Sequence, residues 1–254
     1  MDVGLIGAGN MARALARGWD EPVLVSDVAA QRAQALAAEV GGEALPSNAA
    51  VADRADLLVL CHKPPQLEAV AAGIDGRAKA VASILGGTTL ADLRAAYPGI
   101  PVFRFIPSVA AEVRTGAVGY AEQELFGDAA ALEPQVLELF GRVGRVVPLP
   151  ESLIDVAMGL MSTSPAMFAV IVEALTDAGI RHGMPHDTAA ELVVAAMAGT
   201  AALLQAHDHD TLGLRRSVTS PGGATARGLG ALDRGGVRAA LQDGLDAVLE
   251  ARLR

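Results

Sequence analysis

The sequence predicts an α/β domain with a parallel sheet over residues 1–150, followed by an all-α domain over residues 151–254. In the first part, short apolar runs alternate with helical segments, and the runs are apolar on both faces. Such runs are typical of parallel strands that helices cover on both sides. After PLPES at 148–152 the pattern changes to long, alanine-rich helical segments with few charges.

Each expected strand is a short apolar run bounded by Gly, Pro, Asp or Asn, and the spacing suits βα units. A helix is expected over Val28–Glu39, after the second strand. The expected strands are Val3–Ile6, Val23–Val25, Leu57–Leu60, Val81–Ile84 and Val102–Phe105, with Ala117–Tyr120 and Arg145–Leu149 as later strands of the same sheet.

The second part is expected to be helical over Glu151–Gly183 and Asp187–Ala206. The segment ELVVAAMAGTAALLQA at 191–206 is apolar almost all round. A soluble protein tolerates such a helix only where it is buried on most sides, and one small helical domain offers too little cover. The sequence therefore predicts that this part packs against a second copy of itself.

The composition excludes several kinds of partner. A net charge of -9 argues against a nucleic-acid surface. No uninterrupted apolar run approaches the ~20 residues of a membrane span, so no membrane segment is expected. The single cysteine, Cys61, excludes an internal disulfide and fits a reducing compartment. The expected location is the cytoplasm.

The segment VGLIGAGNMARALARG at 3–18 carries a dinucleotide-binding pattern between a strand and a helix. Gly7 permits the tight turn, Gly9 lets the backbone approach a pyrophosphate, and Ala12 lets the helix pack closely on the strand. The amino end of the helix then offers free N–H groups to the phosphates. This pattern predicts a Rossmann-type domain that binds NAD(P)H.

The second strand ends in Ser26–Asp27, where an acid bonds the adenosine ribose hydroxyls and repels a 2′-phosphate. Asp27 therefore shifts the expected preference mildly from NADPH toward NADH. Arg32, close by in the sequence, could offset that shift.

A second candidate site is SVTSPGGATARG at 217–228. Ser220 and Pro221 predict a helix start, with serine as the N-cap and proline at the first helical position. Gly222, Gly223 and Ala224 then expose N–H groups with almost no side chain, which lets a small anion touch the backbone. Ser220 and Thr225 add hydroxyls. On spacing alone, an ordinary capped helix explains the pattern equally well.

The chain resembles the pyrroline-5-carboxylate reductases along nearly its whole length. The pairing of SPGGAT in a helical second half with a dinucleotide pattern in the first is specific. The matching segments are IGAGNMA near the start, Asn48, HKP at 62–64, SILGG at 83–87, FRFIPS at 103–108, SLIDVAMGL at 152–160, Pro165–Ala166, VTSPGGAT at 218–225 and LDRGGVRAAL at 232–241.

The resemblance implies a reductase that passes hydride from a nicotinamide to 1-pyrroline-5-carboxylate and forms L-proline. It implies that Thr225 hydrogen-bonds the ring nitrogen. Thr225 and Ser220 are the expected catalytic residues, and catalysis is expected to work by orienting the imine and the nicotinamide. The resemblance also implies a dimer of interlocked carboxyl-terminal helices that often assembles further. The substrate carboxylate is expected at Ser220, Gly222, Gly223, Ala224 and Thr225. The cofactor is expected at Gly7, Ala8, Gly9, Asn10, Met11, Ser26, Asp27, Asn48, His62, Lys63, Pro64, Leu85 and Gly86, with Leu85 and Gly86 facing the nicotinamide.

The chain departs from the family pattern at three places. Ser108 stands where the family has asparagine. The segment MSTSPAM at 161–167 has Ser162 and Ser164 in place of two glycines and Met167 in place of a tyrosine. Asp27 is not the residue expected for tight NADPH use. A reductase of a related cyclic imino acid, and a dinucleotide-binding protein without catalysis, therefore stay open as alternatives. No metal site is expected, because His207–Asp210 lacks the separated spacing of a zinc site and fits a solvated loop.

Overall fold

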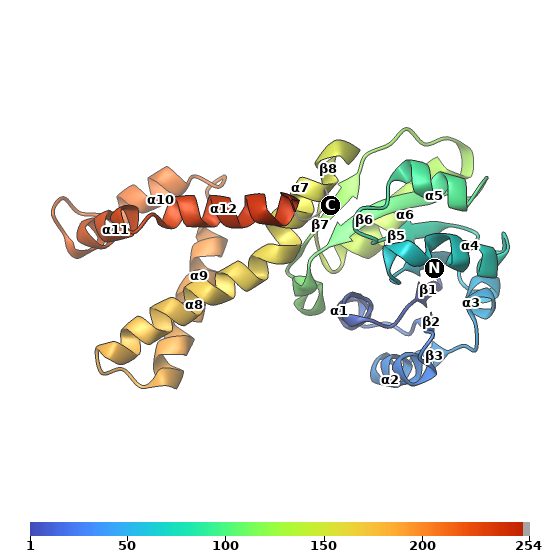
Figure 1. Ribbon diagram of the computed structural model, residues 1–254, viewed down its shortest axis with the longest axis horizontal. Coiled ribbons are helices and arrows are strands. Elements are labelled where there is room, and N and C mark those ends of the chain that lie inside the picture. The colour runs from blue at the N-terminus through green and yellow to red at the C-terminus, as the bar shows by residue number, and fades with distance from the viewer. Residues whose placement is uncertain (251–254) are drawn as a thin grey trace. The chain divides into compact units, whose positions relative to one another are not determined.

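The computed structural model describes residues 1–250 and divides the chain into two compact units, Met1–Ser162 and Thr163–Arg254 (Figure 1). The sequence predicts the boundary between the two domains at residue 150. The residues between that point and Ser162 belong to the first unit because they pack and bond there. Ile154 is fully buried in the second hydrophobic cluster of that unit, and the Ser162 hydroxyl donates a hydrogen bond of 3.2 Å to the Pro107 carbonyl.

The first unit contains one eight-stranded sheet with the order β3-β2-β1-β4-β5-β6-β7-β8. Neighbouring strands are parallel except β6 and β7, so the last two strands run opposite to the others. The parallel sheet that the sequence predicts is confirmed over β1 to β6. The pairing of β6 with β7 is antiparallel, because the single short helix Val109–Val113 joins them and a parallel crossover needs about a dozen residues. The strands are β1 Val3–Ile6, β2 Leu24–Ser26, β3 Glu43–Ala44, β4 Leu57–Leu60, β5 Val81–Ser83, β6 Val102–Pro107, β7 Gly116–Ala121 and β8 Gly144–Leu149.

Helices cover both faces of this sheet, as the sequence predicted. Side chains of α1, α2 and α6 fill the core on one face, and those of α3, α4, α5 and α7 fill it on the other. Among the strands of residues 1–250, β3, two residues long, is the one that the sequence did not predict. The helices are α1 Asn10–Trp19, α2 Ala30–Val40, α3 Asn48–Arg54, α4 Leu67–Ile74, α5 Leu90–Ala96, α6 Gly127–Gly141 and α7 Ile154–Met158.

The strand order reverses at β1, which pairs with β2 on one side and β4 on the other. In open parallel sheets a ligand binds outside the carboxyl ends of the strands at such a reversal. The register sets Ser26, Ile6 and Leu60 side by side across the sheet, and the row continues through Ser83 to Arg104. The segments that follow these residues therefore meet at one edge.

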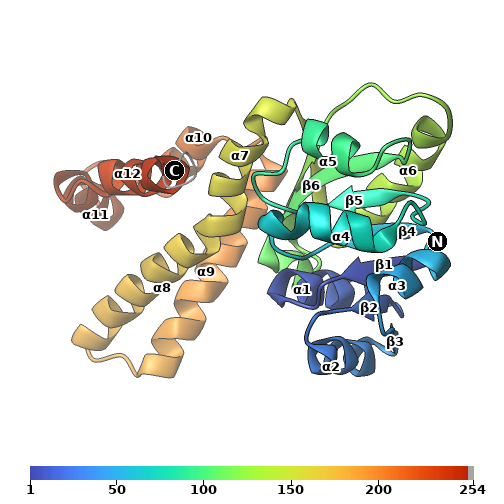
Figure 2. The same cartoon turned by 45° about the vertical axis from the view of Figure 1, so that its right-hand side comes forward.

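As far as residue 250, the second unit is built from helices alone. Helices α8 and α9 lie side by side as a hairpin (Figure 2). Gly183, at φ 88°, turns the chain between them, and a Cβ at Gly179 would lie 3.1 Å from that of Ala189. A π-helical turn, Gly159–Thr163, precedes α8, which has Pro165 in its first turn. The helices are α8 Ser164–Arg181, α9 His186–Ala206, α10 Thr211–Ser217, α11 Ala224–Arg234 and α12 Val237–Glu250.

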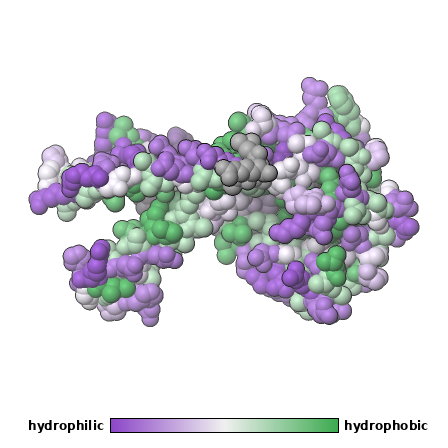
Figure 3. Space-filling view, in the orientation of Figure 1, coloured by the Kyte–Doolittle hydropathy of each residue, from purple (hydrophilic) through white to green (hydrophobic). Residues whose placement is uncertain are grey.

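The second unit has almost no core of its own. Among its described residues only Thr176 and Ala189 are buried, and Figure 3 shows hydrophobic surface over the hairpin of α8 and α9. Phe168 is 51% and Val194 54% exposed. By length and composition, Glu151–Arg181 and His186–Ala206 are apolar enough to cross a membrane. This was not expected from the sequence, because a few polar residues interrupt the apolar runs in both segments. A surface of this kind requires cover by another surface.

Candidate functional site

Two glycines shape the turn after β1 for different reasons. Gly7 has φ 108°, and a Cβ there would lie 2.9 Å from the backbone carbon and oxygen of Cys61, so no side chain fits. Gly9, at φ -77°, has open space around its missing Cβ and precedes α1 as its N-cap. No side chain of the described residues caps α1. The first N–H groups of this helix therefore stay available to an anion.

Asp27 is tied to the glycine turn. Its Oδ2 accepts a hydrogen bond of 2.8 Å from the Ala8 N–H, and its Oδ1 accepts one of 2.8 Å from the Ala29 N–H. The Gly7 N–H donates to the Ser26 carbonyl at 2.8 Å. The ends of β1 and β2 are thereby locked together, and the half-buried Asp27 carboxylate stands beside the turn.

Ser26 and Asn48 also meet. The buried Ser26 hydroxyl donates to Asn48 Oδ1 at 2.7 Å. Asn48 is the first residue of α3, and the Ser47 hydroxyl caps that helix by accepting from the Ala50 N–H at 3.1 Å. The structure thus brings two expected cofactor residues together from segments far apart in the sequence.

The segment after β4 lies next to the glycine turn. The Cys61 N–H donates to the Ile6 carbonyl at 2.9 Å, and burial raises the pKa of the Cys61 thiol. His62 Nδ1 lies 2.9 Å from the Lys63 carbonyl oxygen, burial lowers the pKa of His62, and its Nε2 is buried without a partner among the described residues. Lys63 is exposed, and Pro64 opens a short 3₁₀ helix, Pro64–Gln66.

The loop after β5 completes this edge. The Ser83 hydroxyl accepts from the Leu85 N–H at 3.2 Å, and Gly87 turns the chain at φ 77°. The Leu85 side chain is 2% exposed and belongs to the hydrophobic core. Leu85 can therefore offer a ligand its backbone, whereas the side chain serves packing. The residues expected to bind the cofactor, Gly7–Met11, Ser26, Asp27, Asn48, His62–Pro64, Leu85 and Gly86, all lie at or beside the carboxyl ends of β1, β2, β4 and β5.

In the second unit, helix α11 begins three residues later than the sequence predicts. The N-cap of α11 is Gly223, so the prediction of Ser220 as the cap is wrong. The reason is a tight turn in which the Gly223 N–H donates to the Ser220 carbonyl at 3.0 Å and Gly222 takes φ 68°. A Cβ at Gly223 would lie 2.3 Å from the Ser220 hydroxyl oxygen. The bare helix start survives, one turn later than expected.

The substrate residues expected in this segment stand on the surface of the second unit. Ser220 and Thr225 are exposed, and no side chain of the described residues caps α11. Sequence reasoning missed Arg227, whose Nε and Nη2 donate to the Gly222 carbonyl at 3.3 and 3.2 Å. The sequence did contain an indication of this contact, namely a basic residue in the first turn of a helix that follows two glycines. Its guanidinium adds positive charge beside the turn.

The family departure at Ser108 has a structural explanation. Ser108 is buried, its N–H donates to the Ala117 carbonyl at 2.9 Å, and its hydroxyl accepts from the Ala117 N–H at 3.2 Å. These bonds fasten the connection between β6 and β7. Ser162 likewise uses its hydroxyl within the first unit, on the Pro107 carbonyl.

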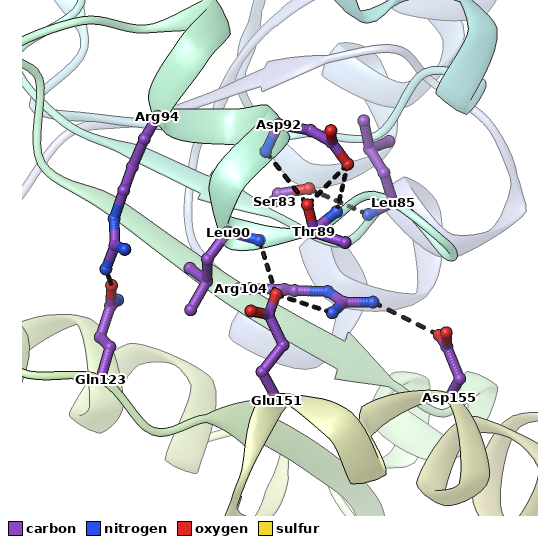
Figure 4. Close-up of polar contacts among 10 residues, drawn as sticks. All are labelled: Ser83, Leu85, Thr89, Leu90, Asp92, Arg94, Arg104, Gln123, Glu151 and Asp155. Carbon is purple, nitrogen blue, oxygen red and sulfur yellow. Dashed lines mark hydrogen bonds and ion pairs between the residues drawn. The ribbon is translucent and has the colours of Figure 1, made fainter.

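Sequence reasoning also missed a cluster of ion pairs around the buried Arg104, drawn in Figure 4. Arg104 is 2% exposed, and its guanidinium reaches Glu151 at 2.9 Å and Asp155 at 3.3 Å. The sign was an arginine inside the apolar strand segment FRFIP, because a charged residue is almost never fully buried unless it is paired. Among residues 1–250 no three His, Cys, Asp or Glu side chains gather as metal ligands.

The comparisons with known proteins assign the first unit. Residues 2–87 match the family described as NADP oxidoreductase coenzyme F420-dependent. With the reversal at β1 and the glycine turn, this defines the protein as an oxidoreductase that uses a nicotinamide dinucleotide. Residues 151–253 match the family described as pyrroline-5-carboxylate reductase dimerisation, so the helical unit serves self-association.

Relatives match over nearly the whole chain. The pyrroline-5-carboxylate reductase of Synechocystis is 30% identical, covering 97% of this chain and 95% of its own, and that of Methanosarcina acetivorans is 32% identical, covering 99% and 96%. The solved 1-pyrroline-5-carboxylate reductase of Streptococcus pyogenes has a TM-score of 0.87 at 25% identity, covering 99% and 98%. The Plasmodium falciparum pyrroline carboxylate reductase with NADP bound shares the fold, with a TM-score of 0.86 at 22% identity, covering 99% and 97%. The chain belongs to the pyrroline-5-carboxylate reductase family.

Proposed function

We propose that this protein reduces 1-pyrroline-5-carboxylate to L-proline with NAD(P)H. The observation that carries the proposal is the presence, in one chain, of an uncapped helix start after a glycine turn in each unit: α1 after Gly7–Gly9 and α11 after Gly222–Gly223. The first suits a pyrophosphate and the second a small carboxylate. The names of the relatives support the same reaction.

The residues at the edge of the first unit fit the cofactor, because the space beside Gly9 is open and a ligand can approach the protein backbone there. When bound, the reduced nicotinamide supplies a hydride. The chain's own task is to position the imine: the N–H groups at the start of α11 hold its carboxylate, and the Thr225 hydroxyl hydrogen-bonds its nitrogen. The substrate is the protonated imine: as hydride adds to its carbon, the C=N π electron pair moves to nitrogen, which keeps its proton, loses its positive charge and becomes the secondary amine.

NADH is proposed as the preferred cofactor. The Asp27 carboxylate stands at the end of β2, where it can accept hydrogen bonds from ribose hydroxyls and repels a 2′-phosphate. Arg32, exposed on α2, is the residue that opposes this preference. The assembly proposed is a dimer, or a higher oligomer built from dimers, through the exposed apolar side chains of α8 and α9. It works in the cytoplasm and uses neither nucleic acid nor a membrane.

A second candidate, a reductase of a related cyclic imino acid, is favoured by one observation. The Ser162 hydroxyl bonds the end of β6 at a position where the family has glycine, and Ser164 and Met167 differ from the family close by. Added bulk there suits a ring of different size or substituents. Turnover of a panel of cyclic imines decides, because preference for the unsubstituted five-membered ring rules this candidate out.

The primary test is consumption of NADH and NADPH by the purified protein with 1-pyrroline-5-carboxylate. Turnover with formation of proline is expected. Folded protein that binds a cofactor but turns over no cyclic imine would instead identify a binding protein without catalysis. Size-exclusion chromatography with light scattering tests the assembly: Leu192→Asp, on exposed apolar surface of α9, should yield monomer, whereas Glu191→Gln on the same helix should leave the dimer intact.

A further inference from the structure

The Arg104 cluster joins three parts of the first unit that are distant in sequence. Glu151 Oε1 accepts from Arg104 Nη1 at 2.9 Å and also from the Leu90 N–H at 2.5 Å. Arg104 Nη2 donates to Asp155 Oδ1 at 3.3 Å. Figure 4 shows Glu151 between the Leu90 N–H and the Arg104 guanidinium. One buried cation thus holds a carboxylate that in turn holds the amino end of α5.

The position of Arg104 in the sheet links this cluster to the expected cofactor site. Arg104 lies in register with Ser83, which lies in register with Leu60 and, through it, with Ile6. Ile6, Leu60 and Ser83 are the last residues of β1, β4 and β5, so this row directly precedes the edge of the sheet where the glycine turn and the segment after β4 meet. The two polar residues of this row, Ser83 and Arg104, both act on the loop 84–89. The Ser83 hydroxyl accepts a hydrogen bond from the Leu85 N–H, and Arg104 acts through Glu151, which accepts one from the Leu90 N–H.

The loop 84–89 is therefore held at both ends. Ser83 fastens its beginning, and Glu151 fastens Leu90, the first residue of α5, just after its end. A carboxylate at a helix amino end is favourable because the helix dipole and the free N–H groups attract it. Glu151 is only partly buried, with a side chain 33% exposed, so without the Arg104 guanidinium it has freedom to turn into solvent.

We propose that Arg104 is a positioning residue for the cofactor site: acting through Glu151, it holds the loop 84–89 in the conformation that receives the nicotinamide. Glu151 is also the first residue that matches the dimerisation family, so the same contact ties that loop to the start of the dimerisation segment. The proposal rests on the proposed function only in taking Leu85 and Gly86 as nicotinamide contacts.

The test measures NADH and NADPH binding to the full-length protein by fluorescence titration, without any imine, together with hydrogen exchange of the segment 84–90. Arg104→Met and Glu151→Gln should each weaken cofactor binding about tenfold, as expected when a hydrogen bond to a charged group is lost, and should speed exchange in that segment. The double variant should be no worse than the single ones, because both changes break one chain of contacts. The KM for the imine should stay unchanged, since its expected cradle lies in the second unit.

The matched control is Lys79→Met, which breaks the ion pair of Lys79 with Asp56 (2.8 Å) near the amino ends of β4 and β5. It should leave cofactor binding unchanged. Unchanged binding in Arg104→Met and Glu151→Gln, or equal weakening in Lys79→Met, would overturn the proposal. If Arg104→Met does not fold, Glu151→Gln decides alone, because it keeps the size and shape of the side chain. If the unaltered protein binds the cofactor normally but turns over no imine, the proposed function is wrong. The effect of the variants on cofactor binding can still be measured and still tests this proposal.

Discussion

The Asp27 carboxylate accepts a hydrogen bond of 2.8 Å from the N–H of Ala8, inside the glycine turn. One side chain thus serves two purposes, since it fixes the turn at which the pyrophosphate is expected and places negative charge where an adenosine ribose is expected. Its second oxygen is engaged by the Ala29 N–H. Changes at Asp27 are therefore expected to alter both cofactor preference and the order of the turn.

Asp27→Ser should raise the ratio of kcat/KM for NADPH to that for NADH by about tenfold, because a like-charge contact with the 2′-phosphate is removed. The serine hydroxyl can still accept one of the two N–H groups, so the variant should fold. Steady-state kinetics with both cofactors checks this. An unchanged ratio would remove Asp27 from cofactor selection, and Asp53→Ser, on the exposed surface of α3, serves as the control.

The two glycines of the turn should respond differently to alanine. Gly7→Ala should lower the free energy of unfolding by about 1–3 kcal/mol, because its φ is strained for other residues and its methyl group meets the Cys61 backbone. Gly9→Ala should unfold like the original protein, since nothing lies within 4 Å of the added Cβ. Its methyl group should nevertheless weaken NADH binding at least about tenfold by occupying the approach to the pyrophosphate.

Urea unfolding and fluorescence titration of both variants check this pair. Tight NADH binding by Gly9→Ala would show that the pyrophosphate does not approach the turn there. A Gly7→Ala variant of full stability would mean that the close contact with Cys61 is not required.

Thr225→Ala should lower kcat about 10²-fold while changing the dissociation constant of the cofactor little, because the hydroxyl is proposed to act on the imine alone. The control is Ser217→Ala, which removes an exposed hydroxyl that donates to the Leu214 carbonyl in the same unit. Single-turnover kinetics and cofactor titration separate the two effects. Equal losses in turnover and cofactor affinity would show that Thr225 has another role.

His62 should make the stability of the first unit depend on pH. Burial holds its folded-state pKa below the ordinary value of 6.5, with the contact to the Lys63 carbonyl opposing that shift only in part. Below about pH 6.5 the unfolded chain takes up a proton that the folded protein resists, so stability falls as the pH falls toward the folded pKa. His62→Val lacks this loss.

Urea unfolding between about pH 7.5 and about pH 5 should therefore show a shallower decline for His62→Val than for the original protein. Parallel declines would indicate that His62 is as accessible to protons in the fold as in the unfolded chain. His186→Val, which alters an exposed histidine of the second unit, should follow the original curve.

Residue types and their spacing are sufficient to predict the two-part architecture, the dinucleotide turn and the apolar character of α8 and α9. Local spacing carries these features: apolar runs separated by helices predict a covered sheet, and Gly7, Gly9 and Ala12 predict the turn. The family resemblance added the residues after β4 and β5, which no local pattern connects to the glycine turn.

The direction of β7 and β8, the N-cap of α11 and the partners of Arg104 became known from the three-dimensional structure. A short connection after β6 excludes a crossover, and a tight turn at Pro221 and Gly222 moves the helix start to Gly223. Arg104 meets Glu151 and Asp155 because a strand and a helix separated by a long stretch of chain pack together. Pairings of this kind arise from packing between distant segments, and a local pattern of residues does not encode them.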